Sequence, residues 1–298
     1  MLSIEGLAKK FGSTQALVDV TFEVNKGEIV GFVGRNGSGK TTTMRCLLGL
    51  LEVDAGVLQL NGDIKSHRDN SQIGYMPEER GLYAKSKVKD QLQYFGELQG
   101  LSTRDAKKST TDLLARFEVS HLGDRVLSTL SLGNQQRIQF IAALVHKPSL
   151  LVLDEPFNGL DPVAMTQLTQ ILREMTLGGA AVLFSSHQLD LVSHLCDRIV
   201  VIDSGTVIAE DTLANLQKRE KIKYQITGSA IPNDLAMKFP ELIIYESPNS
   251  LVATFQRSNF SSEKDLLLKT ILESGSLDGF TEIKPSLSEV YSELINHG

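Results

Sequence analysis

The sequence is poor in cysteine, which limits the redox chemistry it can support. Its 298 residues include two cysteines, Cys46 and Cys196, and no C-x-x-C pair. Both lie in apolar stretches, a setting typical of buried thiols in a reducing compartment. We therefore predict two free, buried thiols, and a redox pair is the alternative.

The sequence also lacks a long hydrophobic run. No stretch of about 18 apolar residues is present, which excludes a membrane-spanning helix. The first residues, Met1 to Glu5, carry neither the basic segment nor the apolar stretch of a signal peptide. We expect a protein that is made in the cytoplasm and stays there.

Basic residues are not in excess. The chain has 30 Lys and Arg against 36 Asp and Glu, a net charge of −6. Because neutralising phosphates requires a basic face, nucleic acid is not expected as the main partner.

The length suggests two domains, and the pattern suggests an unequal division. Strand-like and helix-like segments alternate through the first part, which predicts an α/β domain over residues 1–217. Within it, residues 84–146 are mostly helical in pattern and predict an inserted helical subdomain. The composition changes near residues 218–221, and residues 218–298 then follow the order β-α-β-β-α-β. This order predicts a small ferredoxin-like α+β domain.

A glycine-rich segment follows the apolar strand predicted at residues 29–33. It fits the pattern G-x-x-x-x-G-K-[ST], with a helix predicted after it. Glycines let backbone N–H groups surround a phosphate, a lysine reaches the β- and γ-phosphates, and a Thr hydroxyl can bind Mg²⁺. We predict a nucleotide-binding loop made of Gly34, Arg35, Asn36, Gly37, Ser38, Gly39, Lys40 and Thr41, with Thr42 next in the helix.

A second apolar strand, near residues 149–153, ends in two acids. Asp154 at its end can hold Mg²⁺ directly or through water. Glu155 then points toward the γ-phosphate, where a carboxylate can orient and polarise water. Such a strand is common by itself, and the upstream phosphate loop favours the catalytic interpretation.

Together these motifs resemble the nucleotide-binding subunit of an ATP-binding cassette (ABC) transporter, over residues 1 to about 215. The family's L-S-G-G-Q signature corresponds to the segment Leu130–Gln135, ahead of a predicted helix. Ser131 and Gly133 are retained, whereas Leu132 replaces a glycine and Asn134 a glutamine. The resemblance implies that Ser131 and Gly133 bind a nucleotide held by a second cassette.

Further positions follow the family in order. Asp161 lies in a segment similar to the D-loop, which contacts the opposite subunit. His187 resembles the switch histidine that hydrogen-bonds the γ-phosphate. Phe11 resembles the aromatic residue that stacks on adenine.

The chain departs from the family at Glu78, which aligns with a glutamine in most members. A carboxylate there can still bind Mg²⁺ or position water, and it adds negative charge beside the triphosphate. The segment 77–83 and the ending 285–291 resemble exporters of the type-two branch, which have separate permease chains and include sodium-extrusion and drug- or peptide-resistance systems.

The resemblance implies a P-loop NTPase of the ABC-cassette fold that hydrolyses ATP with Mg²⁺. Glu155, His187 and Lys40 are its expected catalytic residues, and Thr41, Asp154 and Glu78 its metal ligands. Expected partners are a transmembrane permease and a second cassette, favouring a homodimer because every catalytic position is filled. The protein would be peripheral, on the cytoplasmic side of the cell membrane.

Three alternatives stay open: a soluble ABC protein of DNA repair or translation, a P-loop kinase, and a regulatory cassette that only binds ATP. The transported substrate and the role of the second domain are not specified by the sequence.

Overall fold

The computed structural model describes residues 1–64, 70–79, 81–218, 221–229, 231–232, 234–240, 242–247, 249–273 and 275–297. The chain divides into two compact units. The first comprises Met1–Leu213 and the residues from Tyr291 onward, and the second comprises Ala214–Val290. The sequence placed this boundary after residue 217 and the whole C-terminus in the second domain. Burial raises the pKa of the Tyr291 hydroxyl, and a hydrogen bond with the backbone of Arg35 in the first unit acts against that shift.

A sheet of ten strands forms the centre of the first unit, in the order β5-β4-β1-β2-β10-β9-β3-β8-β7-β6. Its parallel part comprises β9 (Arg198–Asp203), β3 (Ile29–Val33), β8 (Ala181–Ser185), β7 (Leu150–Asp154) and β6 (Ile73–Met76). Every residue of β3, β7 and β8 is buried, as short apolar runs predict for strands covered on both faces. Their carboxyl ends meet at one edge of the sheet, where the phosphate loop, Asp154 and Ser185 lie.

The other part of this sheet is largely antiparallel. It comprises β1 (Leu2–Phe11), β2 (Thr14–Val24), β4 (Ala55–Leu60), β5 (Asp63–Ile64) and β10 (Thr206–Asp211), of which β10 pairs antiparallel with β9 and parallel with β2. Alternating residues of β1 and β2, such as Ile4 and Val20, are buried in the main core. The opposite residues are mostly exposed, as alternation in the sequence predicts.

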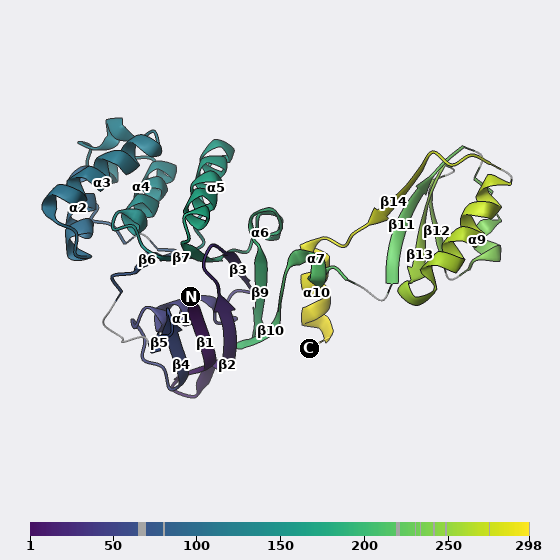
Figure 1. The fold of residues 1–298 in the computed structure, drawn as a ribbon, viewed down its shortest axis with the longest axis horizontal. Coiled ribbons are helices and arrows are strands. Elements are labelled where there is room, and N and C mark those ends of the chain that lie inside the picture. The colour runs from purple at the N-terminus through teal and green to yellow at the C-terminus, as the bar shows by residue number, and fades with distance from the viewer. Residues whose placement is uncertain are drawn as a thin grey trace. The chain divides into compact units, whose positions relative to one another are not determined.

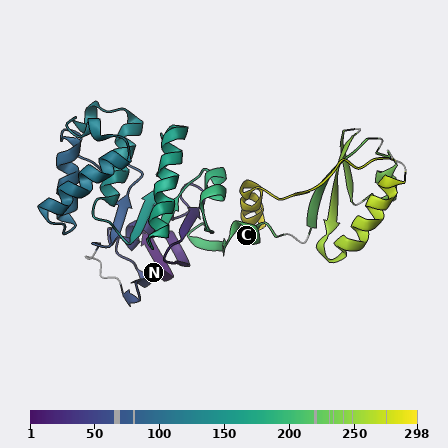
Figure 2. The same cartoon turned by 45° about the horizontal axis from the view of Figure 1, so that its top comes forward.

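Helices cover the parallel strands and form the inserted subdomain. Figures 1 and 2 agree in placing α2 (Val88–Leu98), α3 (Thr103–Arg116) and α4 (Leu132–Leu144) side by side. The short helices η1 (Ser120–Leu122) and η2 (Leu127–Thr129) connect α3 to α4. The remaining helices of this unit include α1 (Lys40–Leu47), α5 (Pro162–Leu177) and α6 (Leu189–Leu195), and α7 (Leu213–Leu216) spans the boundary to the second unit.

Two helix boundaries differ from the sequence-based expectation. The helix predicted after the phosphate loop is α1, which begins within the loop at Lys40 and ends at Leu47, because the chain turns at Gly49 with φ of 67°. Helix α4, predicted after the segment Leu130–Gln135, begins within that segment at Leu132, because Ser131 provides its N-cap. Gly133 therefore lies in the first turn of a helix.

The second unit is a four-stranded antiparallel sheet in the order β12-β13-β11-β14. The strands are β11 (Lys221–Thr227), β12 (Ile243–Ser247), β13 (Ser250–Gln256) and β14 (Gly279–Ile283), with helices α8 (Leu235–Lys238), η3 (Arg257–Asn259) and α9 (Phe260–Leu272) between them. Leu267 and Ile271 of α9 are buried with Ile226, Leu251 and Phe255 of the sheet. The observed order β-α-β-β-α-β confirms the ferredoxin-like expectation.

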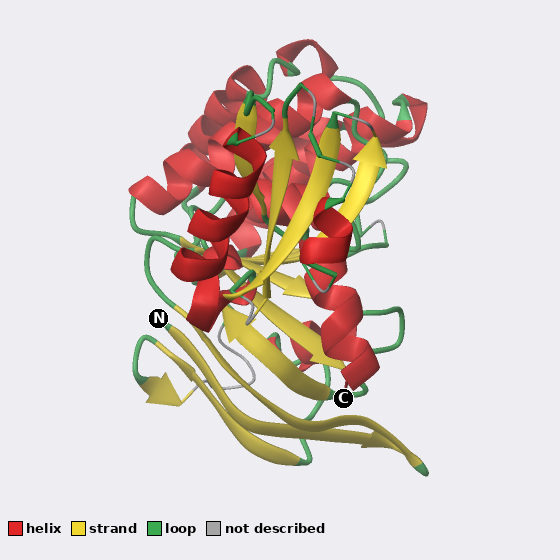
Figure 3. Cartoon of the chain, turned by 90° about the vertical axis from the view of Figure 1, so that its right-hand side faces the viewer, coloured by secondary structure: helices red, strands yellow, loops and turns green. Residues whose placement is uncertain are grey.

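A last helix, α10 (Leu287–His297), follows β14. Helices and strands are both abundant in the chain (Figure 3), so the mixed α/β class is confirmed. Among the residues that the structure describes, no helix has the length and apolar character needed to cross a bilayer.

Candidate functional site

The phosphate loop connects β3 to α1 in a conformation that requires glycine. Gly39 has φ of 114°, and a Cβ atom there would lie 2.6 Å from Cδ2 of Leu17. Gly37, with φ of 80°, also occupies the left-handed region. Helix α1 starts directly after Gly39, so its N-terminal N–H groups are available to bind an anion.

Lys40 lies at the centre of this loop with little solvent contact, its residue being 8% exposed. Its Nζ donates to the carbonyl oxygens of Gly34 at 2.7 Å and Arg35 at 3.1 Å. Burial lowers the pKa of Lys40, and the negative charges of nearby carboxylates, Glu155 foremost, act against that shift. The ammonium group therefore lies near carboxylates in a position where it can also bind a phosphate.

Asp154 is fixed at the end of β7 by two hydroxyl groups. Thr41 Oγ1 donates to one carboxylate oxygen at 2.8 Å, and Ser185 Oγ donates to the other at 2.5 Å. Asp154 is 1% exposed and Ser185 is fully buried. The register of β7 and β8 pairs Asp154 with Ser185, which brings the two side chains together.

Glu155 has a backbone conformation that is unusual for a residue other than glycine, with φ of 51°. Its N–H donates to Ser185 Oγ at 3.0 Å, and its Oε2 lies 2.9 Å from Nδ1 of His187. Burial raises the pKa of Glu155, whereas the hydrogen bond to His187 lowers it. A partly buried carboxylate with a raised pKa, next to a histidine, suits the acceptance of a proton from water.

These side chains surround one cleft of about 470 Å³. Its lining comprises Ala16, Asn36, Gly37, Gly39, Lys40, Thr41, Thr42, Glu78, Asp154, Glu155 and His187. The structure therefore brings together the predicted phosphate loop, both acids after β7, the histidine after β8 and the exposed Glu78.

Other candidate residues lie outside this lining. Ser131 is the N-cap of α4 and accepts a hydrogen bond from Asn134 N at 3.4 Å. Asp161 is the N-cap of α5 and accepts from Ala164 N at 2.8 Å. A Cβ atom on Gly133 would lie 3.3 Å from the carbonyl oxygen of Gly159, so the two segments are neighbours.

Phe11, Gly34, Arg35 and Ser38 are also absent from the lining of the cleft. Phe11 ends β1 with 48% of its surface exposed. Arg35 is an exposed residue of the loop, whereas Ser38 is buried and its Oγ has no hydrogen-bond partner among the described residues.

Two residues that support the site were not predicted. Ser185 holds both Asp154 and Glu155, but in the sequence it is only the last residue of an apolar strand. Gln139 of α4 donates from Nε2 to the carbonyl oxygens of Pro77 at 2.7 Å and Glu79 at 3.3 Å. It thereby fixes the segment carrying Glu78, and its place between the apolar residues Ile138 and Phe140 was the only signal in the sequence.

The site offers oxygen ligands typical of Mg²⁺. In the described part of the chain, no three His, Cys, Asp or Glu side chains converge as they would around a metal ion. Mg²⁺ is usually bound by one or two protein oxygens, with waters and substrate phosphates completing its shell. The Thr41 hydroxyl and the Asp154 carboxylate, 2.8 Å apart, fit this requirement.

Comparisons with known proteins agree with this geometry. Residues 17–158 match the family model described as ABC transporter. YhaQ of Bacillus subtilis, an uncharacterized ABC transporter ATP-binding protein, is 35% identical over 99% of this chain and 98% of its own length. The linearmycin resistance ATP-binding protein LnrL of the same species is 33% identical over 74% of this chain and 71% of its own length.

The fold is also similar to that of solved ABC transporter subunits. A solved ATP-binding subunit of an ABC transporter superposes with a TM-score of 0.69 and 31% identity, covering 73% of this chain and 92% of that structure. Residues 17–158, which the family model matches, include the phosphate loop, Asp154 and Glu155. The chain belongs to the family of ABC transporter ATP-binding proteins.

Proposed function

We propose that the chain is the ATP-hydrolysing subunit of an exporter whose membrane-spanning part is a separate permease. The observation that carries this proposal is the cleft in which Lys40, Asp154, Glu155 and His187 converge on the phosphate loop. A relative named for linearmycin resistance supports the direction of transport. The protein would then be peripheral, on the cytoplasmic side of the membrane.

In this proposal, Glu155 is the proton acceptor for water that attacks the γ-phosphate. Its Oε2 is held by His187 Nδ1 at 2.9 Å, which limits where the carboxylate can point. The side chain of His187 is 58% exposed, so its remaining ring nitrogen can reach a phosphate oxygen. A positioned general base typically contributes about 10²- to 10⁴-fold to a rate.

Lys40 and the loop N–H groups bind the phosphates and stabilise negative charge that develops during transfer. Thr41 and Asp154 would hold Mg²⁺, which supplies further neutralisation of the triphosphate. Glu78 lines the same cleft and is a candidate third oxygen ligand. Phe11 would stack its exposed ring on adenine.

A second copy of the chain would complete the site. Ser131 and Gly133 lie at the N-terminus of α4, where the helix dipole and free N–H groups favour an anion. They do not line the chain's own cleft, which is consistent with a role toward the partner's γ-phosphate. Asp161, close to the same segment, would contact the partner subunit. ATP then joins the two copies, and hydrolysis releases them.

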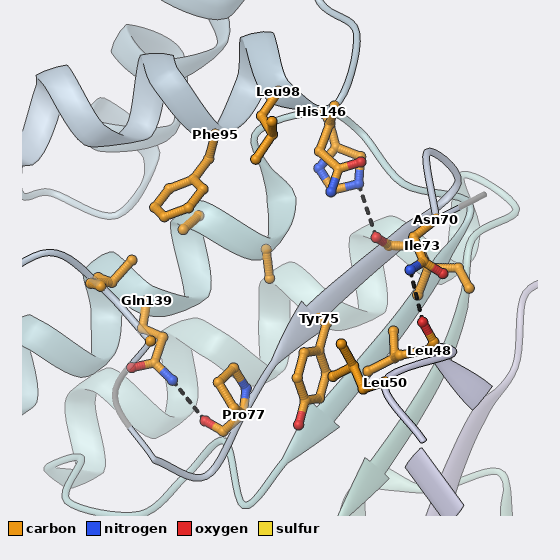
Figure 4. Close-up of a pocket in the computed structure, with 15 residues that line it drawn as sticks. Leu48, Leu50, Asn70, Ile73, Tyr75, Pro77, Phe95, Leu98, Gln139 and His146 are labelled. Atoms are coloured by element: carbon orange, nitrogen blue, oxygen red, sulfur yellow. Dashed lines mark hydrogen bonds between the residues drawn. The ribbon is translucent and has the colours of Figure 1, made fainter. Parts of the chain in front are cut away.

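The permease would bind the groove between the helical subdomain and the segment carrying Glu78. This groove, of about 330 Å³, is drawn in Figure 4. Phe95 and Leu98 come from α2, Gln139 and His146 from α4 and the residues after it, and Tyr75 and Pro77 from β6 and the loop that follows (Figure 4). The exposed side chains of Leu50 and Leu98, 62% and 64% exposed, form an apolar rim suited to a protein partner.

Phosphate release by the purified chain tests this proposal. With ATP and Mg²⁺ the wild type should release phosphate. The Glu155→Gln variant should bind ATP, release at least a hundredfold less phosphate, and form an ATP-dependent dimer in light scattering. Glu23→Gln, at an exposed position on β2, is the matched control and should behave as wild type.

Two outcomes would contradict parts of the proposal. ATP binding without phosphate release by the wild type would indicate a regulatory cassette. Persistent monomers of Glu155→Gln at high ATP and Mg²⁺ would exclude the homodimer. Co-purification with a permease would then test the assignment to transport.

A further inference from the structure

A half-exposed aromatic ring ends strand β1 beside the nucleotide cleft. It belongs to Phe11, which the register of β1 and β2 places opposite Thr14. Ala16, two residues further along β2, lines the cleft, and its carbonyl oxygen would lie 3.1 Å from a Cβ atom on Gly39. The hairpin that carries the ring of Phe11 therefore borders the phosphate loop.

The ammonium group of Lys9 covers one face of this ring. Lys9 Nζ lies over the ring of Phe11, 5.8 Å from its centroid. This distance is within the range at which an aromatic face attracts a cation. The side chain of Lys9 is 13% exposed, so water screens the attraction only in part. Because the ammonium occupies one face, a planar ligand that stacks on Phe11 must use the opposite face.

Asp54 fixes the position of this ammonium group. One of its carboxylate oxygens accepts from Lys9 Nζ at 2.9 Å, and the other accepts from the backbone N–H of Lys10 at 2.6 Å. The backbone N–H of Asp54 donates to the carbonyl oxygen of Ala8 at 3.0 Å. The hydrogen bonds from Lys9 and Lys10 lower the pKa of Asp54, so its carboxylate is charged at neutral pH. Asp54 is thus bonded to three consecutive residues of β1, which holds Lys9 against the ring of Phe11.

A cation on one face of a ring changes how the opposite face binds a base. The faces of two aromatic rings both carry negative π density, which opposes direct face-to-face stacking. An ammonium group attracts this density, so the opposite face of the Phe11 ring becomes less negative. An electron-rich purine then stacks on that face with less repulsion. The ion pair of Lys9 and Asp54 therefore gives the ring a property that an isolated phenylalanine does not have.

We propose that Lys9, held by Asp54, is a positioning residue that prepares the ring of Phe11 to stack on the adenine of ATP. The inference rests on the proposed function, in which Phe11 contacts adenine, and adds to it a charged pair outside the phosphate site. Neither Lys9 nor Asp54 lines the cleft, so both are assigned to the base and not to the phosphates. Their effect should accordingly appear only with a ligand that carries the base.

Equilibrium dialysis of the full chain with ATP and with inorganic tripolyphosphate, each with Mg²⁺, tests this assignment. Tripolyphosphate offers three phosphates and no base. Lys9→Met should raise the dissociation constant of ATP about three- to fivefold and leave that of tripolyphosphate unchanged. Lys9→Arg keeps a cation and should bind ATP within twofold of wild type. Lys10→Met, which removes the same charge from an exposed neighbour, is the matched control and should bind both ligands as wild type does.

Phe11→Ala tests whether Lys9 acts through the ring. This variant should raise the dissociation constant of ATP about tenfold, as the loss of a stacked base predicts, and should bind tripolyphosphate normally. Adding Lys9→Met to Phe11→Ala should weaken ATP binding no further. Asp54→Asn removes the charge that fixes Lys9 and should weaken the binding of ATP alone. Normal binding of tripolyphosphate shows in each case that the phosphate site is folded.

The outcomes separate this inference from the proposed function. Wild-type ATP affinity in Lys9→Met, or an equal loss for ATP and tripolyphosphate, overturns the inference and leaves the proposed function standing. A further loss from Lys9→Met in the Phe11→Ala background overturns it as well, because Lys9 would then act without the ring. Wild-type ATP affinity in Phe11→Ala overturns the adenine contact and this inference together. Failure of the wild-type chain to bind ATP overturns the proposed function itself.

Discussion

Ser185→Ala should destabilise the catalytic unit and slow ATP hydrolysis together. The Ser185 hydroxyl is the common partner of the two acids at the end of β7, donating to Asp154 Oδ1 and accepting from Glu155 N. Alanine removes both hydrogen bonds and leaves a buried carboxylate oxygen and a buried N–H group without this partner.

The magnitude follows from the two lost bonds. A hydrogen bond to a charged group contributes about 1.5–3 kcal/mol to stability, and a neutral one about 1 kcal/mol. Because Ser185 is fully buried, water does not replace them, and the free energy of unfolding should fall by about 2–4 kcal/mol. For a unit of this size, the melting temperature should fall by roughly 5–15 °C.

Turnover should fall as well, because the Glu155 N–H bond helps to hold the φ of 51° at that residue. A displacement of about 1 Å in a catalytic group can cost 10²-fold in rate, so we expect kcat to fall roughly 10- to 100-fold. Phosphate release at saturating ATP and a thermal melt measure the two effects. The control is Ser193→Ala, whose hydroxyl bonds only locally on α6. A Ser185→Ala variant with kcat within twofold of wild type and an unchanged melt would refute the reasoning.

Five other results are expected. Glu155→Gln should lower kcat by roughly 10²- to 10⁴-fold with ATP affinity retained, and a wild-type rate would exclude it as the proton acceptor. Gly39→Ala should abolish ATP binding in equilibrium dialysis, because the new methyl group has no room and φ is 114°. Since Glu155 must be deprotonated to accept a proton, turnover should fall as the pH drops through its pKa. His187→Ala removes the bond that lowers this pKa and should shift the acid limb of the rate profile to higher pH. Burial raises the pKa of the Cys46 thiol to about 11, so Ellman's reagent should modify Cys46 only after unfolding. The expectation of two buried thiols was wrong for Cys196, which is partly exposed.

The fold was largely predictable because its signals are local. A glycine-rich turn after an apolar strand fixes the phosphate loop, and apolar runs of five residues mark the buried strands. The order of elements in the second unit was likewise enough to predict its sheet. Helix ends were less predictable: α1 ends at Leu47, where the chain turns at Gly49 and Leu50 N bonds back to the carbonyl oxygen of Arg45.

Contacts between distant segments account for what the sequence could not supply. Ser185 and Asp154 are 31 residues apart, and only the register of β7 and β8 brings them within 2.5 Å. Gln139 supports the segment carrying Glu78 from 62 residues away. Neither residue type is distinctive by itself. The contact of Tyr291 with the phosphate loop also depends on the chain's return to the first unit.

Helix α4 has two separate roles, one at its N-terminus and one at Gln139. Its N-terminus presents Ser131, and two turns later Gln139 holds the chain's own Glu78 segment. In the proposed closed pair, the first group serves the partner's nucleotide and the second serves the chain's own. Each nucleotide would therefore be contacted or supported by α4 of both subunits. A change in one α4 would then affect both nucleotide sites. Mixed dimers with one altered α4 should accordingly lose more than half of the activity.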